Sequence, residues 1–230
     1  MIKECSEVLK KLKSLSNPKN VEEMARFGIS TENALGISIP DLRDIGKEIG
    51  KNHELAECLW DSGIHEAKVL SSIIDELEKV TEVQMEKWVK DFDSWDICDG
   101  VCNNLFQYTK FAYKKIDQWS KRDEEFVKRS AFTLIACLAI HDKQSHDGVF
   151  LKLLHIIKRE STDERNFVRK AVNWALRNIG KRNIKLNKLA LKTVLEIQRI
   201  DSKSARWIAA DAFRELKSTA VQKRLKSKVL

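Results

Sequence analysis

Glycine and proline are scarce in this chain of 230 residues, which contains only 8 Gly and 2 Pro. Average usage of about 7% Gly and about 5% Pro would give roughly 28 such residues. Because the tight turns of sandwiches and barrels depend on these residues, their scarcity argues against turn-rich β folds and low-complexity chains. With 43% hydrophobic residues the chain can still bury a core, so the composition favours a folded, mostly helical protein.

Long apolar runs are also lacking. No stretch approaches the ~18 uncharged apolar residues that cross a bilayer. The first residues, MIKECSEVLKKLK, mix Lys and Glu where a signal peptide would be apolar. We therefore expect a cytoplasmic protein with no membrane partner.

Cysteine and histidine do not occur with the spacing of metal ligands. The five cysteines, at positions 5, 58, 98, 102 and 137, include no C-x-x-C pair. This argues against both a zinc ribbon and a disulfide framework, and we expect buried thiols. Glycine-rich phosphate loops and H-E-x-x-H are absent as well. We expect no metal and no organic cofactor.

Charge is divided unequally along the chain, whose formal net charge is +8. Residues 1–150 contain 21 basic and 27 acidic groups, a balance of −6, whereas residues 151–230 contain 21 basic and 7 acidic groups, a balance of +14. The basic end is a candidate surface for a polyanion. A solvated basic face without a partner is the alternative.

Helical periodicity runs through the whole sequence, with short breaks and no convincing strand. The helices that we expect span residues 4–15, 20–27, 40–51, 53–61, 65–79, 82–91, 95–108, 110–119, 122–140, 146–159, 163–180, 184–199, 201–216 and 218–227. Many short helices with short connections indicate stacked antiparallel pairs.

A repeat of about 40 residues is visible in the second half. Residues 123–131 (DEEFVKRSA) resemble residues 163–171 (DERNFVRKA), and residues 201–210 (DSKSARWIAA) repeat the pattern of an acid followed by a base and Ala. This spacing is typical of HEAT-like repeats, in which each helix pair packs on its neighbours and the array curves into a solenoid. We expect an all-α superhelical stack that forms a single domain over residues 1–230.

Basic residues recur at equivalent positions of this repeat. Lys128 or Arg129, Arg169 or Lys170, and Arg206 would form a cationic stripe on the concave face, which can follow a phosphate backbone without reading its sequence. Alternatively, each base pairs with acids one turn earlier in its own helix.

The segment around residue 95 combines carboxylates with tryptophan. On a helix that starts at Ser94, Trp95 and Asp99 lie four residues apart and point the same way. Asp93 and Asp96 are explained by the helix N-terminus, and Trp95 by core packing. Asp99 lies beyond the first turn, so these structural explanations account for it less well.

A second group lies on the helix predicted over residues 163–180. Lys170, Trp174 and Arg177 share one face at i, i+4 and i+7. Indole can pack on a sugar or base while flanking cations hold phosphates. Packing of Trp174 in the core is the alternative.

Four segments together resemble the AlkD-like family of HEAT-repeat alkylpurine DNA glycosylases, over nearly the whole chain. They are LGISIPDLR at residues 35–43, WDICD at 95–99, KRSA at 128–131 and RKAVNWALR at 169–177.

The resemblance implies a DNA glycosylase of base excision repair that cleaves the N-glycosidic bond of cationic alkylated purines, such as 3-methyladenine and 7-methylguanine, without base flipping. Asp99 would match the catalytic carboxylate, and Trp95 and Trp174 the aromatic pair that holds the lesion nucleotide. Arg129 would match the basic residue of the same cleft, and Arg43 and Arg177 phosphate contacts.

Two other functions fit the same features. One is a non-catalytic protein that recognises branched or damaged DNA, and the other is a protein-interaction scaffold. The partner that we expect is double-stranded DNA containing alkylated purines, bound by a monomer in the cytoplasm at the nucleoid.

Overall fold

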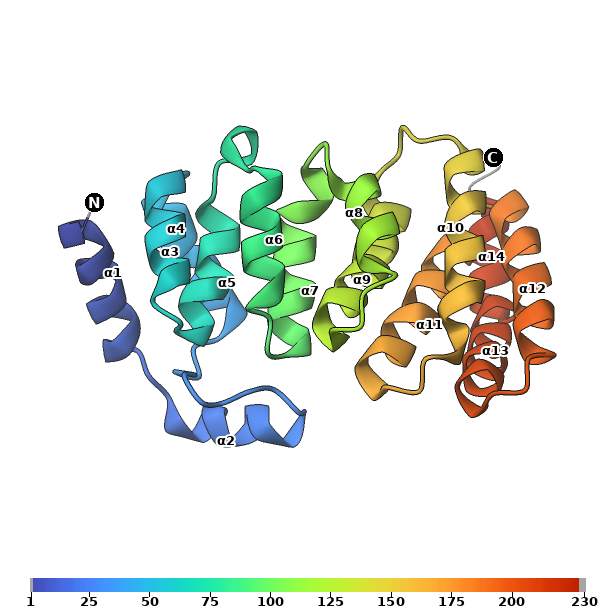
Figure 1. Ribbon diagram of the computed structural model, residues 1–230, viewed down its shortest axis with the longest axis horizontal. Coiled ribbons are helices and arrows are strands. Elements are labelled where there is room, and N and C mark those ends of the chain that lie inside the picture. The colour runs from blue at the N-terminus through green and yellow to red at the C-terminus, as the bar shows by residue number, and fades with distance from the viewer. Residues whose placement is uncertain (1, 228–230) are drawn as a thin grey trace. The chain divides into compact units, whose positions relative to one another are not determined.

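The computed structural model describes residues 2–227, which form 14 α-helices and three short 3₁₀ helices and contain no strand (Figure 1). The helices of the first half are α1 (Ile2–Ser14), α2 (Pro18–Arg26), α3 (Ile39–Ile49), α4 (His53–Asp61), α5 (His65–Ile74), η1 (Leu77–Lys79), α6 (Glu82–Lys90), α7 (Trp95–Asn104) and η2 (Phe106–Tyr108). Those of the second half are α8 (Ala112–Trp119), α9 (Glu125–His141), α10 (Asp147–Arg159), η3 (Glu160–Thr162), α11 (Asn166–Gly180), α12 (Ile184–Gln198), α13 (Lys203–Leu216) and α14 (Thr219–Ser227). The predicted all-α architecture is confirmed.

The chain divides into two compact units, Met1–Phe111 and Ala112–Leu230. Each unit is built from helices that pack mainly on their neighbours in sequence or on the helix two places along. None of the helices within residues 2–227 is long and apolar enough to span a bilayer.

In the first unit, α5 packs on α3, α4 and α7, and α1 packs on α4. The core between α4 and α6 contains Trp60 and Trp88, which are buried and stacked in parallel with ring centroids 4.0 Å apart. The stacked rings hold α4 against α6.

A disulfide joins Cys5 of α1 to Cys58 of α4. The prediction of buried thiols is therefore wrong for this pair, whereas Cys98, Cys102 and Cys137 are buried thiols. The pairing arises because α1 packs on α4, a contact that the sequence spacing does not reveal.

The helix α2 buries none of its residues and is held mainly through the segment that follows it. The amide of Asn17, its N-cap, donates to the carbonyl of Leu35 at 2.7 Å, and the side chain of Asn20 donates to the carbonyl of Gly36 at 2.8 Å. Gly36 has φ +78°, and a Cβ there would lie 2.3 Å from the Asn17 carbonyl oxygen. Only glycine fits this turn.

In the second unit the predicted repeat is present as helix pairs. The first helices α9, α11 and α13 pack in that order, and the second helices α10 and α12 pack on each other. Val127, Val168 and Ala205 occupy the third position of α9, α11 and α13, and all three are buried. The HEAT-like spacing read from the sequence thus corresponds to a real stacking unit.

Several predicted helix boundaries are wrong, and three of them have a visible cause or break. The helix predicted over 65–79 ends at Ile74, because Asp75 adopts an extended backbone and turns its side chain inward. The helix predicted over 95–108 breaks at Leu105 before η2. The helix predicted over 163–180 starts at Asn166, because the Asp163 carboxylate instead accepts from the backbone and side chain of Arg165.

Candidate functional site

Helix α7 carries Trp95 and Asp99 on one half-exposed face of the first unit, whereas Ile97 and Cys98 between them are buried. The indole Nε1 of Trp95 donates to the carbonyl of Phe27, the residue that ends α2, at 3.0 Å. The predicted pairing of an aromatic ring and a carboxylate on one helix face is therefore present, and it lies beside the end of α2.

Asp96 lies in a different environment from Asp99. Its carboxylate contacts Nε2 of His65 at 2.8 Å and accepts from the Ser94 hydroxyl at 2.6 Å. Burial disfavours the charge of Asp96, but the hydrogen bonds from His65 and Ser94 and the charge of His65 hold its pKa below the usual range. Burial likewise disfavours protonation of His65, yet Asp96 raises the pKa of His65. As expected from its position, Asp96 serves the start of the helix.

Ser94 is the N-cap residue of α7, but its side chain makes no capping bond to the backbone. The hydroxyl donates to Asp96 instead. The start of α7 is therefore fixed by contacts among the side chains of Ser94, Asp96 and His65. An ordinary serine cap would instead bond to the helix backbone.

Glu66 is a positioning residue that sequence reasoning missed. It is 1% exposed, and its carboxylate accepts from the backbone amides of Leu35 at 2.8 Å and Gly36 at 2.6 Å. The neighbouring amide of His65 donates to the carbonyl of Asn33. The first turn of α5 thus holds the loop after α2 on one side and α7 on the other. No local pattern indicates this role, because the partners of Glu66 are about 30 residues away in sequence.

Arg43 lies on α3 at a basic hollow of about 390 Å³. The hollow is also lined by Lys47, Lys51 and Asn104, and no acidic side chain contributes to its lining. Lys47 pairs with Asp44 at 2.7 Å. The hollow joins α3, α5 and the end of α7, so the first unit places Arg43 where a phosphate would meet several positive charges.

Lys170, Trp174 and Arg177 lie along α11 in the second unit, as predicted. Lys170 is exposed, and Trp174 and Arg177 are half-buried. The guanidinium of Arg177 forms ion pairs with Glu215 and, at 3.7 Å, with Asp211, both on α13. Part of the positive charge of this row is therefore balanced within the protein.

Arg129 is 5% exposed, and its Nη1 donates to the carbonyl of Phe167 at 2.6 Å. Phe126 and Phe167 also contact each other, with ring centroids 5.6 Å apart. Arg129 therefore belongs to the packing of α9 on α11.

The predicted cationic stripe is partly neutralised. Lys128, Arg169 and Arg206 occupy the fourth position of α9, α11 and α13. Lys128 pairs with Glu160 at 2.9 Å, Arg206 pairs with Asp201 at 2.8 Å, and Arg169 lies over the ring of Trp207. Pairing with an acid about one turn earlier is confirmed for Arg206, because Asp201 lies just before α13, whereas Glu160, the partner of Lys128, belongs to η3. The role of the stripe in binding a phosphate backbone stays a prediction.

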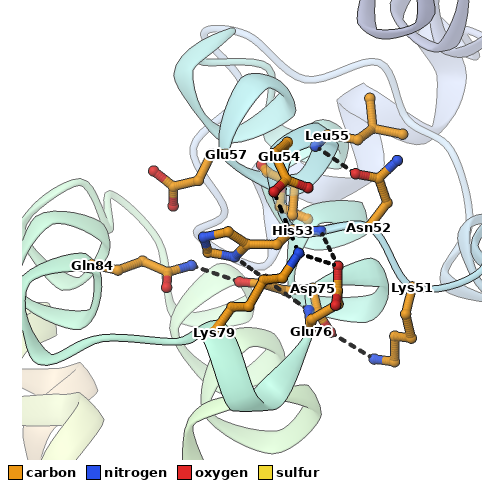
Figure 2. A network of polar contacts seen from close by, with 12 residues as sticks. Lys51, Asn52, His53, Glu54, Leu55, Glu57, Asp75, Glu76, Lys79 and Gln84 are labelled. Atoms are coloured by element: carbon orange, nitrogen blue, oxygen red, sulfur yellow. Dashed lines mark hydrogen bonds and ion pairs between the residues drawn. The ribbon is translucent and has the colours of Figure 1, made fainter. Parts of the chain in front are cut away.

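A buried polar network outside these groups surrounds Asp75 (Figure 2). Its carboxylate contacts Nδ1 of His53 at 2.7 Å and accepts from the Gln84 amide at 2.6 Å, and Lys51 donates to its backbone carbonyl at 2.9 Å. These contacts join the start of α4, the end of α5 and α6. The network explains why α5 stops at Ile74. No group of three or more His, Cys, Asp or Glu suited to a metal occurs within residues 2–227.

Comparisons with known proteins agree with this architecture. A family model described as DNA alkylation repair enzyme matches residues 8–216. A solved structure from a family related to the HEAT-like repeat DNA glycosylases, with affinity for branched DNA structures, matches with a TM-score of 0.75 and 18% identity over 91% of this chain and 94% of that chain. A designed armadillo repeat protein in complex with a peptide matches with a TM-score of 0.32 and 15% identity over 96% of this chain and 80% of that chain. None of the curated proteins matches at a significant level.

Proposed function

The chain belongs to the DNA alkylation repair enzyme family, and on that premise we propose that it is a DNA glycosylase for cationic N-alkylated purines such as 3-methyladenine and 7-methylguanine. The observation that supports this proposal most directly is the placement of Asp99 with Trp95 on one half-exposed face of α7. A carboxylate beside an aromatic ring suits a reaction at a sugar carbon.

The chemistry requires little acid catalysis. N-alkylation makes the purine a cationic leaving group, so the transition state resembles an oxocarbenium ion, as in glycoside hydrolysis. Asp99 would stabilise the positive charge that develops at C1′ and orient the attacking water. The electron pair of the broken bond leaves with the purine and neutralises it, and the proton lost by water passes to Asp99 or to solvent.

The remaining predicted residues would bind the DNA. Trp95 and Trp174 would pack on the lesion nucleotide, and Arg43 and Lys170 would contact phosphates from exposed positions. Arg129 and Arg177 would act from partly or fully buried positions, each already holding a protein partner. We propose that this arrangement needs no extrusion of the base, because the contacts proposed here are to the backbone and sugar.

A second candidate is a non-catalytic protein that binds branched DNA. It is favoured by the solved structure of similar fold, whose family has affinity for branched DNA. In this case the basic hollow at Arg43 and the row on α11 would still bind DNA, but Asp99 would have no catalytic role.

Release of bases from methylated linear duplex DNA tests the two candidates. We expect release of 3-methyladenine or 7-methylguanine well above the spontaneous rate, and Asp99→Asn should lower it about 10²- to 10³-fold while leaving DNA affinity nearly unchanged. Asp93→Asn is the matched control, since Asp93 is exposed in the same segment. Wild-type activity in Asp99→Asn would move catalysis elsewhere. No release by the wild-type protein, with tight binding of branched DNA, would support the second candidate.

A further inference from the structure

Helix α13 has an exposed face that combines two aromatic rings with four cations. The buried side chains of α13 form a regular stripe that includes Ala205, Ile208 and Leu216. The exposed residues are Lys203, Arg206, Trp207, Ala210, Phe213, Arg214 and Lys217. At 100° per residue they fall within about one third of the helix circumference, so they form one continuous surface.

The two rings of this face are exposed although large aromatic side chains normally contribute to the core. Trp207 is 39% exposed and Phe213 is 42% exposed. One side of Trp207 is covered by the guanidinium of Arg169 from α11, 4.8 Å from the ring centroid. This contact fixes the indole in place. The Cα atoms of Trp207 and Phe213 are about 9 Å apart along the helix axis. The small side chain of Ala210 lies between them in sequence.

The charge of this face is positive even after its ion pairs are considered. Two acids of the same region are engaged: the exposed Asp201 pairs with Arg206, and the half-buried Asp211 pairs with Arg214. Lys203 and Lys217 remain, with no carboxylate partner within the described residues, and Arg169 adds a third charge at Trp207. A flat apolar ring beside cations is the combination that binds single-stranded nucleic acid, because bases stack on the ring and phosphates contact the cations.

We propose that the α13 face binds an unpaired strand of DNA, with a base stacked against Trp207, a second base at Phe213, and phosphates at Lys203 and Lys217. The surface is separate from the residues proposed for glycosidic cleavage. It would add affinity for forked or branched DNA, which offers unpaired nucleotides, over linear duplex DNA, which does not. A protein partner is less suited to this face, because four cations surround only two apolar side chains.

Binding to three fluorescent probes tests the inference: a single-stranded oligothymidylate, a fork with an unpaired thymidine arm, and a linear duplex with the same paired sequence. In Trp207→Ala combined with Phe213→Ala, affinity for the single strand and the fork should fall about 5-fold or more, and affinity for the duplex should stay within about 2-fold. Trp207→Phe should recover part of the loss. Leu195→Ala is the matched control, because Leu195 is 48% exposed on α12 and carries no aromatic ring.

Two results would overturn the inference. Unchanged affinity for the single strand in the double variant would exclude stacking on α13. An equal loss for fork and duplex would mean that the face contacts paired DNA or that the variant is misfolded, and circular dichroism separates these. Base release from methylated linear duplex is measured on the same variant and should stay at the wild-type rate. A failure of the proposed glycosylase would instead appear in the wild-type protein, so the two outcomes are distinguishable.

Discussion

Replacing His65 with alanine should destabilise the protein in a pH-dependent manner. His65 is 6% exposed and the Asp96 side chain is 22% exposed, with 2.8 Å between Nε2 and the carboxylate. The pKa of His65 is raised from 6.5, so its contribution is fully present below about pH 6.5 and is lost as the pH rises through the raised value. The pKa of Asp96 is lowered from 3.8, so its contribution is present above about pH 3.8 and is lost as the pH falls through the lowered value. The ion pair therefore stabilises the fold from about pH 4 to above pH 6.5.

The expected size follows from the burial of the pair. Removing one partner of a fully buried ion pair costs about 3–5 kcal/mol, because the other charge stays uncompensated. Since Asp96 is about one fifth exposed, water offsets part of this cost, and we expect a loss of about 3 kcal/mol in the free energy of unfolding at about pH 5.5. At a pH well above the raised pKa of His65, a neutral imidazole would provide only an ordinary hydrogen bond, and the loss should fall to about 1 kcal/mol.

Urea unfolding at these two pH values measures the effect. The charges that face His65 are those of Asp96, Glu66 and Asp93, so a double-mutant cycle with Asp96→Asn separates the pair from the other two. His155→Ala is the control, because His155 is exposed and its Nδ1 contacts the backbone carbonyl of Leu151, not a carboxylate. Equal losses at both pH values, or a coupling energy near zero, would refute the reasoning.

Three further outcomes are expected. Glu66→Gln should lower the free energy of unfolding by about 2–4 kcal/mol, because one of the two short bonds to loop amides is lost and the other is no longer charge-assisted; a loss below about 0.5 kcal/mol in urea unfolding would contradict this. Glu215→Gln should raise DNA affinity and steepen its dependence on salt by up to about two ions, because Arg177 and Lys181 lose their ion pairs with Glu215, and an unchanged slope in a salt titration would argue against it. The disulfide between Cys5 and Cys58, 53 residues apart, should stabilise the protein by up to about 4 kcal/mol, and a thiol assay on the denatured protein should find three reactive thiols; five would disprove the bond.

Much of the fold was predictable because it depends on local periodicity. Apolar residues at helical spacing define nearly every helix, and the recurrence of Phe126-Val127 at Phe167-Val168 marks the stacking of α9 on α11. One boundary could not be predicted because its cause is a side chain far along the chain. Helix α5 stops at Ile74 because Asp75 finds His53 and Gln84, a partnership that no local pattern encodes.

In the candidate site, too, the local features were predictable and those that depend on distant contacts were not. The shared faces of Trp95 with Asp99 and of Lys170 with Trp174 follow from helix geometry alone. The environment of Asp96 does not, because it depends on a histidine 31 residues away. The contact between Glu66 and the loop after α2 could not be predicted either, since a carboxylate that binds backbone amides needs no particular residue type in the loop.

Ion pairing redistributes the charge of the basic end but does not reduce its total. Of the seven acids in residues 151–230, the structure pairs six with cations and leaves only Glu164 without an ion pair among the described residues. The excess of 14 positive charges therefore persists, and beyond a Debye length of about 8 Å a polyanion responds to that excess. Close to the surface, however, the response depends on position. The cations without carboxylate partners, such as Lys170, Lys203 and Lys217, are those whose removal should reduce the salt dependence of DNA binding most, whereas Arg177 should change it little until Glu215 is neutralised.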